Sequence, residues 1–94
     1  VVQQEQVLLQ VKSEMKRYNA SIRKYQELVK TDDEIIGLRE QVKLASASQL
    51  EQGVITSSDY VREVNAEEQA RLSKALHALQ LLEAIIHQKT LIGQ

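Results

Sequence analysis

The sequence contains no cysteine, proline, tryptophan or phenylalanine, and only three tyrosines and three glycines among its 94 residues. A chain of this length and composition cannot build a globular core around aromatic side chains. The absence of proline lets helices run without interruption, and the frequent Gln, Glu, Leu, Ala, Lys and Val are typical of long helices. We therefore expect an all-α fold within a single small domain.

The charge pattern and the hydropathy pattern exclude two classes of partner. The formal net charge is −1, and acidic and basic residues alternate without a basic stripe for phosphates, so nucleic acid is not an expected partner. No apolar run approaches the roughly 20 residues of a membrane-spanning helix. The densest run, 75–86, is interrupted by His77, Gln80 and Glu83. We expect this segment not to be embedded in a membrane.

Catalytic and metal-binding signatures are also missing from the sequence. No nucleophile, base and orienting group can be placed together, so we do not expect an enzyme, and no motif calls for a cofactor. His77 and His87 lie ten residues apart, about 80° around a helix, and neither cysteine nor a second ligand pair accompanies them. We interpret both as solvated or packed histidines rather than as metal ligands.

The clearest local signal lies between residues 49 and 60, where one helical pattern stops and another starts. Gly53 can adopt the left-handed backbone conformation that ends a helix at the C′ position, which leaves Gln52 as the last half-helical residue. A connection of only about four residues returns the second helix beside the first. The sequence therefore predicts a long antiparallel two-helix coiled-coil hairpin with its tip at 53–56.

The residues after Gly53 predict how the second helix starts. Thr56 is suited to be its N-cap, and Asp59 can reach back to the Thr56 N–H in a shortened capping box. Ile55 and Tyr60 then occupy the hydrophobic-staple positions. A well-capped loop would account for these features alone, but it leaves the second β-branched apolar residue, Val54, without a role. We therefore expect one apolar side chain of the tip to face a partner.

The first helix is predicted over about residues 3–52. Its apolar residues follow the alternating steps of three and four that are typical of a coiled-coil seam: Leu8, Val11, Met15, Tyr18, Ile22, Tyr25 and Val29. Beyond Thr31–Glu34 we expect the seam to resume one residue out of phase, at Ile35, Leu38, Val42 and Ala45, with a drifting contact face or a kink near residues 30–33. Thr31 and Glu34 also form a capping-box pattern, so a fresh helix start is an open alternative, although we favour continuity.

The second helix is predicted over about residues 57–92 and changes character along its length. Its first half is rich in charged residues, Glu67 among them, and is expected to lie largely in water. Between Leu72 and Ile86 the polar residues form a narrow stripe that leaves about two thirds of the circumference apolar: Lys74, His77, Gln80, Glu83 and His87. A helix of this kind needs more than one neighbour. The unequal helices also leave about the first 15 residues without an intramolecular partner.

Several of these segments together carry a resemblance to a known family. Leu50 through Tyr60, then Asn65-Ala66-Glu67 and Gln69 through Leu72, and finally Leu91-Ile92-Gly93 are similar to the second long helical hairpin of TolC-type outer-membrane efflux proteins, and within them to Bacteroides-like members. The resemblance runs from about Tyr25 to Gly93. Its sharpest element is the tip pattern of Gly, two variable residues, Ser or Thr, and Asp three residues later.

The resemblance implies a location, an assembly and a partner. In that family three protomers form a channel in which an outer-membrane β-barrel continues into a periplasmic tunnel of packed helical hairpins. The resemblance places Gly53, Val54, Ile55 and Thr56 at the periplasmic entrance, where such tips meet the hairpin tips of a periplasmic adaptor (membrane fusion) protein. Self-association is implied as well, as a trimer in the full-length channel and as another oligomer for the hairpin alone.

This sequence departs from the family pattern at three points. Gln52 stands where relatives often have Val, and residues 44–50 contain none of the acidic residues that ring the closed entrance in some relatives. The strands of the β-barrel are absent, and the chain begins at Val1 rather than at an initiator methionine, so we expect a mature product or a piece of a larger protein. A carboxylate gate is doubtful here, with Glu51 as the one nearby candidate.

The leading hypothesis is therefore a periplasmic tunnel segment of an outer-membrane export channel that docks an adaptor through its tip. Two alternatives stay open. The chain could be a coiled-coil scaffold or interaction module whose partner helix lies along the seam, or the helical hairpin of a periplasmic adaptor itself.

Overall fold

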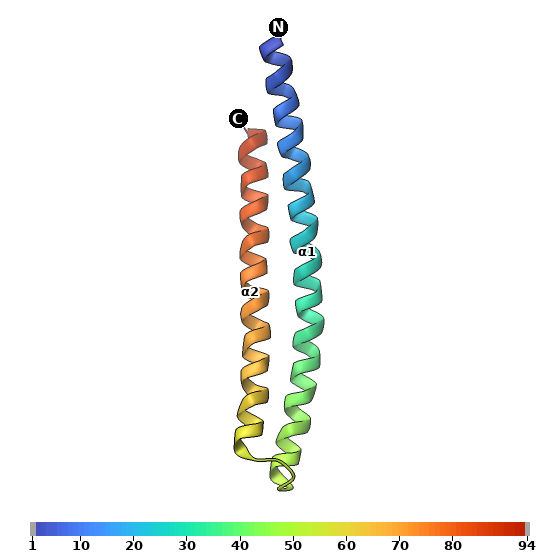
Figure 1. Cartoon of the computed structure of the whole chain (residues 1–94), viewed down its shortest axis with the longest axis vertical. Helices are drawn as coiled ribbons and strands as arrows, with labels where there is room; N and C mark the ends of the chain where they lie inside the picture. The colour runs from blue at the N-terminus through green and yellow to red at the C-terminus, as the bar shows by residue number, and fades with distance from the viewer. Residues whose placement is uncertain (1, 94) are drawn as a thin grey trace.

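The computed structural model describes residues 2–93, with side-chain surroundings from residue 3 onward. Helix α1 spans Val2–Glu51 and helix α2 spans Ser57–Gly93, joined by residues 52–56. Figure 1 shows the two helices running antiparallel from the tip, with α1 extending beyond the end of α2. The molecule measures 77 × 15 × 14 Å. The structure thus confirms the predicted all-α antiparallel hairpin.

Helix α1 is continuous through the segment in which a break was considered. Residues Thr31–Glu34 all lie within α1, so the capping-box pattern there does not start a new helix. Thr31 is exposed, whereas Asp32 is buried. The alternative of a fresh helix start is therefore wrong.

The predicted change of seam phase is also wrong. Ile35, Leu38, Val42 and Ala45, the residues at which the seam was expected to resume, are all exposed. Instead the seam of α1 keeps its original steps of three and four and passes through residues that are mostly polar. Its buried or half-buried members beyond Val29 are Asp32, Ile36, Lys43, Ser46 and Leu50.

The geometry of a continuous helix explains this outcome. A slip of one residue would turn the contact face by about 100°, which a rigid rod packed against a single partner cannot do without losing the contacts on one side of the slip. The polar seam residues find partners on α2, and none of the buried side-chain nitrogen or oxygen atoms among the described residues lacks a hydrogen bond. Continuity of the backbone therefore outweighs the apolar pattern.

Helix α2 turns its polar stripe toward α1. Lys74, His77 and Gln80 are half-buried, while Glu83 and His87 at the edge of the stripe are exposed. Among the described residues, the only buried hydrophobic side chains are Ile36 and Ala84, so the two helices enclose a small apolar core.

The expectation of a wet first half of α2 fails at one residue. Glu67 is 3% exposed, a smaller exposed fraction than that of the buried Asp32, Ile36, Ser46 or Ala84. Sequence reasoning assigned Glu67 to the solvent because charged and polar residues dominate the first half of α2. The Glu67 carboxylate is buried because it receives hydrogen bonds from cations of both helices.

The register of the hairpin leaves the start of α1 uncovered. Asn19 on α1 pairs with Gln88 on α2, so the end of α2 at Gly93 lies opposite about residue 14. Residues 3–10 are exposed throughout. None of the described helical residues forms a segment long and apolar enough to cross a membrane.

Candidate functional site

The tip is built by a helix C-cap that uses the one positive φ angle of the described backbone. Gly53 has a φ of +73°. Its N–H donates to the Leu50 carbonyl at 3.0 Å, and the Val54 N–H donates to the Gln49 carbonyl at 2.9 Å. These two bonds form a Schellman motif with Gly53 at C′. The Gln49 and Leu50 carbonyls are thereby satisfied without any side chain of the tip.

The start of α2 is fixed by a reciprocal pair of hydrogen bonds. The Asp59 N–H donates to the Thr56 hydroxyl oxygen at 3.2 Å, and the Thr56 N–H donates to an Asp59 carboxylate oxygen at 3.0 Å. The Thr56 backbone N–H, followed by the Thr56 side chain, holds the pKa of the Asp59 carboxyl below its usual value. Both residues named for tip capping thus satisfy each other, and Tyr60 behind them is half-buried.

These two caps leave one apolar side chain at the apex without cover. Val54 is 67% exposed, whereas Ile55 is half-buried. In a Schellman motif the residue at the Val54 position commonly packs against the residue at the Gln49 position, but Gln49 offers no apolar surface. Gly53 and Thr56 are also exposed. The four residues predicted to dock a partner therefore lie together at one end of the rod.

Below the tip, the seam contains a charged cluster centred on Glu67. Lys43 Nζ lies 2.5 Å from Glu67 Oε2, and Arg71 lies 3.1 Å from Glu67 Oε1. Arg71 also pairs with Glu40 of α1. The hydrogen bond from Lys43, with further help from Arg71, holds the pKa of the Glu67 carboxyl below its usual value.

A second polar cluster lies near the middle of the seam. The buried Asp32 of α1 accepts a hydrogen bond from Ser73 at 3.5 Å, and its other oxygen lies 2.5 Å from His77 Nδ1. Lys74 pairs with Asp33 beside it at 2.6 Å. The sequence analysis interpreted His77 as a solvated or packed histidine and did not pair it with Asp32. Asp32 continues the steps of three and four along the α1 seam, and His77 does so along the polar stripe of α2. This shared spacing is the sequence signal that could have paired them.

The apolar side chains that the polar seam displaces lie on the outside of the hairpin. Helix α1 exposes Ile35, Leu38 and Val42, spaced by three and four residues on a face beside the seam. Helix α2 exposes a longer set on the face that points away from α1, 50–64% exposed, which we call the leucine row: Leu72, Leu76, Leu79, Leu82 and Ile86. The hairpin thus has a polar middle section of its seam, from Asp32 to Ser46, and apolar side chains on two outer faces.

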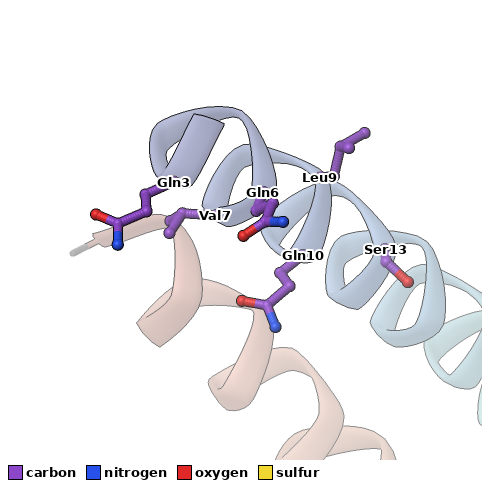
Figure 2. A pocket seen from close by; sticks show the side chains of 6 residues that line it. All are labelled: Gln3, Gln6, Val7, Leu9, Gln10 and Ser13. Carbon is purple, nitrogen blue, oxygen red and sulfur yellow. The ribbon is translucent and has the colours of Figure 1, made fainter. Parts of the chain in front are cut away.

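Neither the histidines nor the hollow near the start of α1 contains a group of metal ligands among the described residues. The described residues contain no group of three or more side chains that could hold a metal ion. The His87 ring lies 6.0 Å from the Tyr18 ring. Figure 2 shows a shallow hollow near the start of α1 whose labelled side chains all come from α1, with Leu9 pointing away from α2. Its glutamine-rich lining gives it no charged group to bind a ligand.

No protein-family model, curated protein or solved structure matches this chain.

Proposed function

We propose that this hairpin is a periplasmic wall segment of a TolC-type outer-membrane export channel and docks a periplasmic adaptor protein through its tip. The observation that carries the proposal is the large apolar surface on the outside of the hairpin. Polar side chains occupy much of the seam between Asp32 and Ser46, while the leucine row and the row from Ile35 to Val42 face outward. Such a hairpin gains most of its apolar burial from neighbours, and a wall of packed hairpins supplies a neighbour on each side.

The tip supports the docking part of the proposal. The Schellman motif and the capping box satisfy their own backbone groups, so Val54 is not needed to hold the turn. An exposed β-branched side chain on a rigid apex is suited to enter a shallow apolar site of another protein at little cost in conformational entropy.

In this mechanism the hairpin is passive. It closes part of the tunnel wall through its outer rows and holds the adaptor at 53–56. Export would draw its energy from an inner-membrane partner, and the location would be the periplasmic part of an outer-membrane protein.

A coiled-coil interaction module is the second candidate, and the exposed row of α1 favours it. A partner helix could lie along Ile35, Leu38 and Val42, whose spacing fits a helical seam. In that case the tip would make no contact with the partner.

Cross-linking in the natural host distinguishes the two. A photoreactive residue is placed at Val54, at Val42 and, as a polar exposed control, at Gln41 of the intact protein. We expect Val54 to capture a periplasmic adaptor, with the protein in the outer-membrane fraction. Gly53→Ala and Thr56→Ala should reduce that capture while helicity is nearly unchanged. Capture of a soluble helical protein at Val42, with none at Val54, would replace the channel proposal by the interaction module.

A further inference from the structure

We infer that the leucine row of α2 is a self-association surface, on which a second copy of this chain packs antiparallel with Leu79 at the two-fold axis. Leu79 lies two residues after His77 and two before Leu81 of the seam, which places it about 180° around the helix from α1. The dimer and the proposed channel use the same row, so one copy cannot take part in both contacts at once. In a tunnel all tips lie at one entrance, whereas in this dimer they lie at opposite ends.

The spacing of the leucine row is symmetric about Leu79. Leu76 and Leu82 lie three residues before and after it, and Leu72 and Ile86 lie seven residues before and after it. A two-fold contact requires that whenever residue i meets residue j, j also meets i. An antiparallel pair centred on Leu79 meets this condition for every member of the row. Leu72 of one copy then faces Ile86 of the other, and the two Leu79 side chains face each other.

The residues beside the row are complementary under the same symmetry. Leu76 and Leu82 lie on opposite edges of the row. On the edge that carries Leu82, Ala75 of one copy lies opposite Leu82 of the other, a small side chain against a large one. On the other edge Leu76 meets Glu83, which lies about 40° around the helix from Leu79, nearer the axis than Leu76 itself. Its carboxylate has to reach the margin of the contact through the flexible side chain, so this position limits the apolar burial of the row.

The charges at the two ends of the row fix the direction of the second copy. Glu68 and Lys89 are exposed on the edge of the row that also carries Leu82. They lie eleven residues before and ten residues after Leu79. In the antiparallel pair each Glu68 therefore faces a Lys89. A parallel pair would instead bring Glu68 against Glu68 and Lys89 against Lys89, so the charges favour the antiparallel arrangement.

The extent of this surface sets the expected affinity. From Glu68 to Lys89 the contact is about 32 Å long and about 10 Å wide. An interface made by one helix face has an area at the small end of the range for specific interfaces. The dimer should therefore form at micromolar rather than nanomolar concentration. Its population must therefore be measured over a range of concentrations.

Cysteine cross-linking of the 94-residue chain tests the arrangement, since the natural sequence has no cysteine to interfere. With a short bis-maleimide reagent, Leu79→Cys should cross-link to itself. Leu72→Cys and Ile86→Cys should each fail alone, because their copies lie about 21 Å apart along the axis, but an equimolar mixture of the two should cross-link. Self-cross-linking of Leu72→Cys as efficient as that of Leu79→Cys would show a parallel pair and overturn the inference.

Sedimentation equilibrium with charge variants provides the second test. Leu79→Glu should weaken dimerisation by about a hundredfold or more, since it places two carboxylates together at the axis. Glu68→Lys should weaken it by several-fold, and adding Lys89→Glu should restore the original affinity. Gln41→Lys, on the outer side of α1, serves as a matched control with no effect. A chain that stays monomeric up to millimolar concentration, or a dimer insensitive to Leu79→Glu, would refute the inference.

Discussion

The left-handed turn at Gly53 allows a stability prediction with an internal control at Gly37. Both glycines have open space where a Cβ would be added, with no heavy atom within 4 Å. They differ in backbone conformation. Gly53 has a φ of +73°, whereas Gly37 lies inside α1. An added Cβ therefore clashes at neither site. Alanine disfavours the left-handed backbone at Gly53 but favours the helical backbone at Gly37.

The magnitudes follow from this difference. At Gly53, alanine in the left-handed region costs about 1–2 kcal/mol, offset by about 0.4–1 kcal/mol from the lower entropy of the unfolded chain. A net loss of about 1 kcal/mol is expected. At Gly37, the helix interior favours alanine by about 0.8–1 kcal/mol. The two variants should differ by about 2 kcal/mol.

Thermal unfolding followed by circular dichroism measures the effect. For a domain of this size, a loss of about 1 kcal/mol lowers the Tm by about 4–8 °C, and a gain raises it by a similar amount. All variants must be compared at one protein concentration, because association adds apparent stability. Gly53→Asn should fall between wild type and Gly53→Ala, since asparagine tolerates the left-handed region. If Gly53→Ala matches wild type, or Gly53→Asn is as unstable as Gly53→Ala, the C-cap does not govern the tip.

Three further outcomes are expected from the caps and the polar seam. Thr56→Ala should cost about 0.5–2 kcal/mol in urea unfolding. It should flatten the acid limb of stability only in part, because alanine keeps the backbone N–H that lowers the Asp59 pKa most; the stability from this lowered pKa is present above about pH 4 and is lost as the pH falls through the folded-state value. Glu67→Gln should destabilise the hairpin at pH 7 but approach wild type as the pH falls through the lowered pKa of Glu67. A loss that persists once the carboxyl is protonated would contradict a charge-based role. Replacing both Asp32 and His77 by Leu should leave stability unchanged or raise it by about 1 kcal/mol or more, whereas Asp32→Leu alone should be less stable than the double variant, as chemical denaturation would measure.

The tip could be predicted from the sequence because its signals are local. Gly53 demands a left-handed position, and Thr56 and Asp59 cap the helix that follows, so each residue determines the backbone within one turn of itself. The hairpin and its approximate bounds follow from that turn together with the absence of proline. No long-range contact is needed to reach this part of the fold.

The contact face below the tip could not be predicted in the same way. Sequence reasoning followed the apolar residues, and beyond Val29 these leave the seam for an outer face at Ile35. The true seam continues through Asp32 and Lys43, which become recognisable only when their partners on α2 are known. Hydrophobic periodicity marks the apolar faces of a helix, and an apolar face need not be the one buried within the chain.

The polar seam has a role that an apolar one could not fill as well, because it restricts the register of the two helices. An apolar heptad seam can slide by seven residues and still bury similar side chains. Here such a slide would move Lys43 from Glu67 to face Lys74, and it would leave Asp32 opposite Ala84 instead of His77. Like charges would meet and a buried carboxylate would lose its partner. The resulting loss of free energy is larger than the gain from the apolar contacts of the shifted register. The charged pairs between α1 and α2 therefore reinforce the register that the turn at Gly53 sets, and the apolar rows outside them stay exposed.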